Sequence, residues 1–504
     1  MSAETEADRV AILNGALRLK AQRSPLKPGE LRDWQADRRS RDPIKRLSRE
    51  FDEIARQAVD PADLAAGMEA AGINDRIARE FYNEESVFRL AELVLELVPV
   101  ELPDPLAYDY NPWRRPFWNH LSRGLLYALP TLPYVVAISF THVTAVGIWV
   151  LLVACVVSTA FTQGLAHFAH LFLGYGVTKA AVRVLRLALL GVIVVGGLIA
   201  VWIGLATAAG VLVAGIAYGV LLYTVAATVL MVFKRERLLL ASLMPAILLS
   251  VVVLLAPGHL LGYPVVICSF LVVCVVAVVS VAAWVLWDES RPRGPKWMPL
   301  ARAEVAAAGL HALYGAVAAA LMTFAVVDVL QFGNVIDGEN LIGVGMLPLV
   351  VSLGFAEANV YGFRSECSTA MARSYSRQQF KPEARHILAR RLLAYAATLV
   401  VLTVIVLLPR YLAVGIDSIT MLRHVAYGEL GIALLGAMML VSCGLARKAT
   451  ILLGLGLVVD VLVRLPASGT LEELTTAHVV VFAGLIVVVW WTAFRDLVSP
   501  LRHR

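Results

Sequence analysis

Polar side chains that can handle protons or ions interrupt several long apolar segments of this chain. Gln163, His167 and His170 are spaced by four and three residues, so a helix places all three on one face. His311 and Tyr314 share a helical face in the same way. We predict that these five residues line a substrate or ion pathway, with the two imidazoles of the first group suited to proton transfer. The alternative is hydrogen bonding to neighbouring helices.

A carboxylate and an amide lie close together in a later apolar segment. Glu357 and Asn359 both follow the run Gly354–Phe355–Ala356. A charge at bilayer depth costs about 2.5–3.5 kcal/mol on insertion scales and is kept mainly where a cavity or a partner compensates it. We predict a cation or proton site here that faces the bundle axis. The alternative is an ion pair between Glu357 and Arg364 near the cytoplasmic end.

A third polar group combines an acid and a base. Asp460 precedes Arg464 by four residues, which is the favourable order for an ion pair within one helix. We therefore expect an intrahelical ion pair, with gating or substrate contact as the alternative. Asp328 and Glu429 are expected to lie close enough to the outer surface to be solvated.

The composition shows which elements must position these residues. Hydrophobic residues make up 59% of the 504-residue chain and charged residues 16%, against about 45–50% and 25% in soluble domains. This balance excludes a soluble globule, a disordered chain and a disulfide-rich secreted scaffold. Twelve segments are long enough to cross a bilayer. They run over residues 122–141, 143–173, 185–205, 207–233, 238–257, 262–287, 303–330, 341–363, 390–409, 423–443, 448–464 and 475–494.

The connections between these segments carry a consistent charge asymmetry. Even-numbered connections and the tail hold 22 lysines and arginines, whereas odd-numbered connections hold three. Because basic loops stay in the cytoplasm, both termini are predicted to be cytoplasmic and the protein to lie in the plasma membrane. A missed or invented segment would break the alternation, so the asymmetry also favours a count of twelve.

The predicted fold is all-α: a polytopic membrane protein with twelve transmembrane helices in two six-helix bundles and an N-terminal cytoplasmic helical domain. The four predicted parts are that domain (residues 1–110), an interfacial linker (111–121), and the two bundles (122–287 and 303–495). Helical periodicity in the first part covers residues 5–22, 43–59, 62–71 and 84–98. No basic recognition helix follows, so nucleic acid is not an expected partner. Membrane lipids are.

The two bundles share a short pattern. Ser158, Phe161 and Gln163 of the second segment match Ser352, Phe355 and Glu357 of the eighth. Each of these segments runs into a basic connection that favours helix, and equal topology in both halves indicates parallel repeats about an axis along the membrane normal.

This arrangement resembles the multidrug/oligosaccharidyl-lipid/polysaccharide flippase superfamily, over residues 122–495 at the level of topology. Within the superfamily it is most similar to twelve-span bacterial polysaccharide exporters. The residues that carry this likeness in the second half are Phe355, Arg364, Ser365, Tyr375, Arg390 and Arg391. The resemblance implies alternating access by two bundles arranged as a V, which export a lipid-linked or polymeric glycan. Because the central spans carry few cations, a polyanionic cargo does not fit well.

Other classes are less favoured. The major facilitators expect a long central loop and an acid after span two, and the run Gly174–Lys179 has no acid. The chain has no P-loop, no HExxH, no GxSxG and no paired-cysteine motif. We therefore expect no catalytic residues, no metal site and no cofactor.

Two functions follow from the sequence. The first is a secondary transporter or flippase coupled to an ion gradient. The second is a non-transporting membrane anchor or regulator that contacts envelope-biosynthesis proteins through residues 1–110. A wet central cavity that meets Gln163, Glu357 and Asn359 would favour the transporter.

Overall fold

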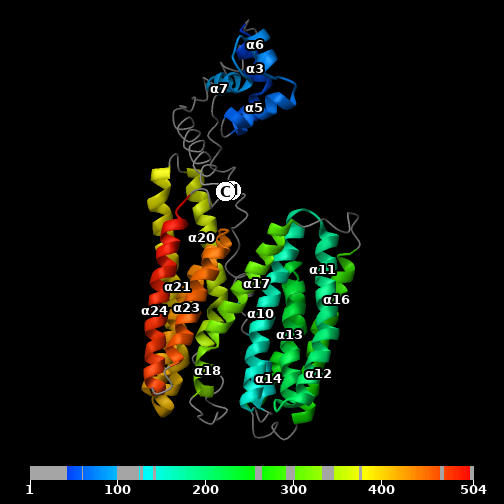
Figure 1. Ribbon diagram of the computed structural model, residues 1–504, viewed down its shortest axis with the longest axis vertical. Helices are drawn as coiled ribbons and strands as arrows, with labels where there is room; N and C mark the ends of the chain where they lie inside the picture. Colours follow the sequence, from blue (N-terminus) through cyan, green and yellow to red (C-terminus); the bar gives the residue numbers. More distant parts are fainter. Residues whose placement is uncertain are drawn as a thin grey trace. The chain divides into compact units, whose positions relative to one another are not determined.

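A computed structural model describes most of the chain. The described residues are 42–58, 61–98, 124, 126, 129–139, 144–255, 264–290, 301–331, 346–373, 377–465 and 470–499. Over these residues the regular structure is helical (Figure 1). The chain divides into two compact units: residues 1–114 with 364–387 and 498–504, and residues 115–363 with 388–497.

The described residues of the N-terminal part of the first unit form five short helices. They are α3 (Pro43–Glu50), α4 (Asp52–Gln57), α5 (Pro61–Ala70), α6 (Asp75–Tyr82) and α7 (Val87–Leu97). The apolar side chains of Leu47, Leu64, Met68, Leu90 and Val94 are at most 2% exposed and share one core. This core explains why α7 forms: Leu90 and Val94 are four residues apart on its buried face.

The helix predicted over residues 43–59 is two helices in the structure, because the chain bends at Phe51 between α3 and α4. The predicted helix start at Asn74 is confirmed. The Asn74 side chain accepts hydrogen bonds from the backbone of Arg76 and Ile77 and caps α6. The helix expected over residues 5–22 lies outside the described residues.

The helices that fall in the twelve predicted segments form the second unit, except that the adjoining ends of α20 and α21 (residues 364–387) belong to the first. They are α9 (Thr131–Ser139), α10 (Ala145–Gly174), α11 (Thr178–Gly191), η2 (Val192–Gly196), α12 (Gly197–Ala206), α13 (Gly210–Val232), α14 (Glu236–Leu255), α16 (Pro264–Asp288), α17 (Arg302–Met322), α18 (Phe324–Gln331), α20 (Leu347–Arg373), α21 (Arg377–Val414), α22 (Ser418–Ser442), α23 (Ala446–Arg464) and α24 (Leu471–Asp496). Among the described residues, nine helices are long and apolar enough to cross a membrane.

The third and seventh predicted spans are not single α-helices. The third contains one π-helical turn, η2, between α11 and α12. Tyr218 of α13 donates a hydrogen bond to the Ile193 carbonyl in this turn at 2.9 Å. The seventh breaks at Thr323 into α17 and α18. The second break lies beside the buried charges described below.

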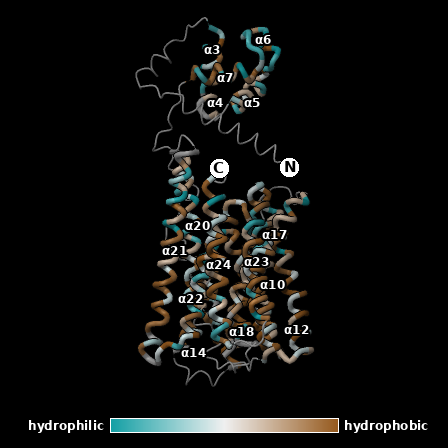
Figure 2. The backbone as a smooth tube through the Cα atoms, turned by 60° about the vertical axis from the view of Figure 1, so that its left-hand side comes forward, coloured by the Kyte–Doolittle hydropathy of each residue, from teal (hydrophilic) through white to brown (hydrophobic). Residues whose placement is uncertain are grey.

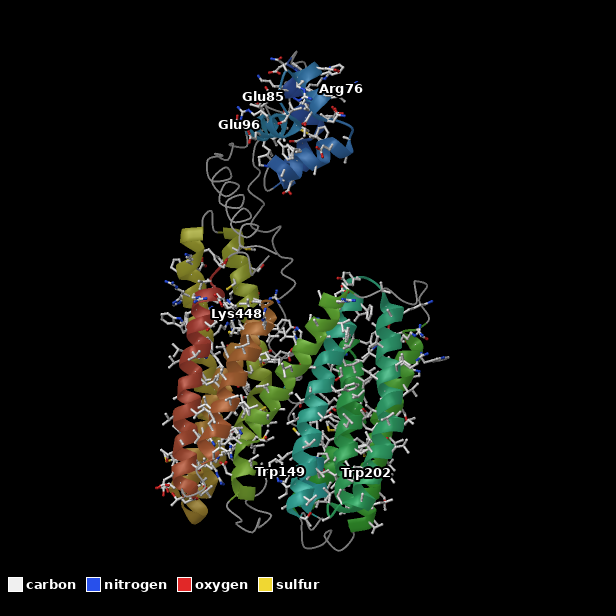
Figure 3. The ribbon with its side chains drawn as sticks, in the orientation of Figure 1. Arg76, Glu85, Glu96, Trp149, Trp202 and Lys448 are labelled. Carbon is white, nitrogen blue, oxygen red and sulfur yellow. The ribbon has the colours of Figure 1, made fainter. Side chains whose placement is uncertain are left out.

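The surfaces of these helices are those of membrane spans. Figure 2 shows hydrophobic residues along α10, α12, α21, α23 and α24, whereas α3 and α6 of the N-terminal helices are mixed. Trp149 and Trp202 lie near one end of the long helices and Lys448 near the opposite end (Figure 3). Tryptophan and lysine are typical of membrane interfaces. The chain is therefore an all-α polytopic membrane protein.

Packing within the second unit follows the two halves predicted from the sequence. In the first half, α13 packs against α10, α12 and α16. In the second half, α22, α23 and α24 pack against one another. The halves meet through α10 and α17, and α17 also packs against α22 and α23. Helix α17 therefore connects the first half to the core of the second.

Candidate functional site

The interface between α10 and α17 brings together residues that were predicted to lie on separate helices. The imidazole rings of His167 and His311 stack with centroids 4.2 Å apart and planes tilted by 20°. Tyr175, at the end of α10, donates a hydrogen bond to Glu304 Oε1 at 2.7 Å. Contacts across the α10–α17 interface therefore continue for several turns from the end marked by Tyr175.

Small residues let the two helices approach closely. A Cβ atom on Gly315 would lie 2.8 Å from Cγ of Gln163 and 2.9 Å from the Thr159 carbonyl oxygen. A Cβ atom on Gly164 would lie 3.2 Å from Cβ of Ala312. The Gln163 side chain is exposed beyond this contact. The backbones of α10 and α17 therefore lie close together, and polar side chains line the contact between them.

A second close approach joins the halves through Gly124, in the first predicted segment, and Gly354 of α20. A Cβ atom on Gly124 would collide with the backbone of Gly354. We call this contact the glycine crossing. The offset between Ser158 and Ser352 equates Gly354 with Ala160, which lies between the two α10 residues that Gly315 contacts. The glycine crossing, between the first and eighth segments, is thus similar in position to the Gly315 contact between the seventh and second segments.

The second half contains a buried cluster of four charged or titratable side chains, which we call the buried ion cluster: Asp328, Asp460, Arg464 and His478. Their side chains are between 0% and 10% exposed. Arg464 Nη1 contacts Asp328 Oδ1. Its Nε and Nη2 donate hydrogen bonds to Asp460 Oδ2 and Oδ1 at 3.1 and 3.3 Å. One guanidinium therefore bridges two carboxylates from different helices.

His478 of α24 completes the cluster from the other side. Its Nε2 lies 2.9 Å from Asp460 Oδ1 and its Nδ1 lies 3.5 Å from Asp328 Oδ2. The ring is fully buried. Aromatic side chains surround it: Phe324 lies with its ring centroid 4.9 Å from that of His478 and 5.1 Å from that of Phe482. Such surroundings strengthen electrostatic interactions among the four polar groups.

The buried ion cluster also supports the break in the seventh span. A break frees backbone carbonyls, which need donors inside a membrane. Arg464 Nη2 donates to the Phe324 carbonyl at 3.3 Å, and the Tyr427 hydroxyl donates to the Met322 carbonyl at 3.4 Å. The start of α18 is therefore held by the same arginine that holds its carboxylate, Asp328.

The predicted site residues thus fall into distinct places. Gln163, His167 and His311 meet at the α10–α17 interface, while Tyr314 is 8% exposed and His170 is exposed. The ion pair between Asp460 and Arg464 is present, but as part of the larger cluster.

The carboxylate and amide predicted on the eighth span are both on α20. Glu357 is half-buried. The Asn359 amide donates to the Phe355 carbonyl of the same helix at 2.8 Å, so part of its hydrogen-bonding capacity is used locally.

One expectation is wrong. Asp328 was expected to be solvated near the outer surface, yet its side chain is 0% exposed. The reason is that α18 turns this carboxylate toward Arg464 and His478 rather than away from the bundle.

His478 did not stand out from the sequence. One signal was available in the sequence. Asp460 lies near the C-terminal end of α23, His478 near the N-terminal end of α24 and Asp328 in the short helix α18, so all three lie toward the same side of the helix bundle. Depth alone, however, does not tell which faces meet.

Comparisons with known proteins identify the fold. No protein-family model matches the chain, and no curated protein matches it. Solved structures do. The Vibrio cholerae MATE transporter VcmN in its bent form is 14% identical, with a TM-score of 0.50 over 76% of this chain and 96% of that one. A structure described as an outward-facing multidrug resistance MATE family transporter of the MOP superfamily is 16% identical, with a TM-score of 0.48 over 77% of this chain and 96% of that one.

The likeness to VcmN shows the fold. The chain has the fold of MATE transporters, which is the twelve-helix architecture predicted from the sequence. The all-α, twelve-helix fold that the sequence predicted is therefore confirmed.

Proposed function

We propose that this protein is a secondary transporter that works by alternating access, with its two six-helix halves closing alternately on the two sides of the membrane. The observation that carries the proposal is the α10–α17 interface. It joins the halves through small residues and stacked imidazoles. Such a contact is compact enough to close and polar enough to be wetted when it opens.

The charge of the connecting loops indicates which side of the membrane the α10–α17 interface closes; we call this interface the gate. We propose that the basic connections lie in the cytoplasm of a cell whose plasma membrane holds the protein, with both termini inside. Tyr175 and Glu304 then mark the cytoplasmic end of the α10–α17 interface. The structure corresponds to a state in which this cytoplasmic gate is closed.

For the cargo, we propose a lipid-linked or polymeric glycan, on the basis of the superfamily resemblance of the sequence. The structures similar in fold are described as multidrug transporters, so a small amphipathic compound is the competing cargo. Efflux of ethidium, set against translocation of a short-chain lipid-linked saccharide in reconstituted vesicles, separates the two. We expect the saccharide to be moved.

Cross-linking tests alternating access without knowledge of the cargo. In a background without native cysteines, Gly164→Cys is combined with Ala312→Cys. The two Cβ atoms would be 3.2 Å apart, so a small shift brings them to the separation of about 3.5–4.5 Å that a disulfide needs. A third cysteine at Gln163 reports access to the polar part of the interface. A membrane-impermeant maleimide should label it from both sides of the membrane while the pair is reduced, and from outside alone once the pair is oxidised.

A cysteine at Lys448 is the control, because it lies at the cytoplasmic end of α23 and should be labelled from the inside in either state. A static anchor or regulator gives a different result. Labelling of Gln163→Cys from one side only, unchanged by reduction of the disulfide, would contradict alternating access.

A further inference from the structure

The number of ionisable groups in the buried ion cluster leaves room for one proton. When both aspartates are ionised, they carry two negative charges against one positive charge on Arg464, so a neutral His478 leaves one negative charge in excess. Uncompensated charge is costly in a buried site. A single proton on the imidazole balances the cluster.

The geometry around His478 matches that proton. A neutral imidazole has one N–H and serves as a donor on one side only, whereas an imidazolium donates on both. Here both ring nitrogens face carboxylate oxygens, Nε2 at 2.9 Å from Asp460 and Nδ1 at 3.5 Å from Asp328. Nδ1 of His478 and Oδ2 of Asp328 are both buried and make no hydrogen bond among the described residues. The protonated ring therefore satisfies two carboxylates that the neutral ring cannot satisfy together.

A metal ion fits the same place poorly. Hard cations take about six or more oxygen ligands. In the buried ion cluster, Arg464 already contacts an oxygen of Asp328 and both oxygens of Asp460, and the imidazole occupies the space on the other side. The cluster supplies a cation of its own, so it is suited to a proton.

Helix α22, which also packs against α24, carries other ionisable groups: Arg423, His424 and Tyr427. His424 Nδ1 faces the Thr420 carbonyl oxygen at 2.8 Å rather than a carboxylate. Both ring nitrogens of His478, by contrast, face aspartate carboxylates.

We propose that His478, held between Asp328 and Asp460, is a proton-binding site that couples proton occupancy to the angle between α17 and α18. Protonation links α24 to both α18 and α23. Loss of the proton removes the link from α24 to α18, which continues from α17 at the break, and leaves α18 held through Arg464 of α23. Because α17 forms the α10–α17 interface, the proton acts on the gate. This last step rests on the proposed function, whereas the proton site itself does not.

Proton uptake measures the site directly. Wild-type protein in lipid nanodiscs should bind about one proton more per chain between pH 8 and pH 4 than His478→Gln, since one titrating ring is removed. The control Lys448→Met leaves every histidine in place and should match the wild type. Coincident titration curves for wild type and His478→Gln would overturn the proposal.

A second measurement does not depend on the variant folding. In wild-type protein labelled with ¹⁵N-histidine and ¹³C-aspartate, solid-state NMR should show one imidazolium with both ring nitrogens close to aspartate carboxyl carbons at low pH. A neutral ring at that position throughout the range would refute the site. Proton binding without any change in side-specific labelling at Gln163 would instead leave the site standing and remove the proposed function.

Discussion

Replacing Arg464 by leucine should destabilise the protein by about 3–5 kcal/mol, because it leaves Asp328 and Asp460 buried without their shared counter-charge. The change also removes the donor to the Phe324 carbonyl at the helix break. The buried thiols of Cys274, Cys367 and Cys443 offer a readout, since a thiol-reactive dye labels them when the protein unfolds on heating. The melting temperature should fall sharply.

Two further variants separate charge from packing. Arg464→Leu combined with Asp328→Asn and Asp460→Asn should recover much of the lost stability, because no buried charge is then left without a partner. Lys448→Met is the surface control: its pair with Asp496 is 45% exposed on the lysine side, and its loss should cost less than about 1 kcal/mol. Wild-type stability in Arg464→Leu alone would show that the cluster is not electrostatically coupled.

The second large effect is expected at the glycine crossing. Gly124→Leu inserts a side chain where a Cβ atom on Gly124 would collide with the backbone of Gly354. The neighbour is backbone and has no flexible atoms to move aside, so we expect a cost of at least about 3 kcal/mol. Separation of the two halves should appear as early thiol exposure in the same heating assay and as a low yield of folded protein.

The control for this variant is Gly484→Leu. Gly484 lies on α24, and a Cβ atom there meets nothing within 4 Å. Gly484→Leu should leave the melting temperature close to that of the wild type. Equal behaviour of the two leucine variants would mean that the halves do not depend on this close approach.

Much of the fold follows from hydropathy and charge alone. Long apolar runs must be helical in a membrane because every backbone group needs an internal partner. That is why the segments containing α10 and α24 were predicted. The break at Thr323 was not, because it depends on Tyr427 and Arg464, which reach it from other helices.

The candidate site was only partly predictable. The spacing of Gln163 and His167 shows which side chains share a face, but not that His311 lies opposite. Pairing of the imidazoles depends on how α10 docks on α17, and that depends on glycines more than 100 residues apart along the chain. Asp460 and Arg464 were recognisable because four residues separate them within one helix. Asp328 and His478 join them through tertiary packing alone.

The most direct measurement of alternating access is a pair of distances across the two halves. Spin labels at Leu187 and Ile451, on exposed faces of α11 and α23 near one end, report that end, and labels at Leu205 and Leu465 report the other. Electron–electron double resonance in lipid nanodiscs at pH 5 and pH 8 should show the two distances changing in opposite directions. Oxidising the Gly164→Cys and Ala312→Cys pair should fix both at single values. One unchanging narrow distance for each pair, with or without the disulfide, would contradict the account.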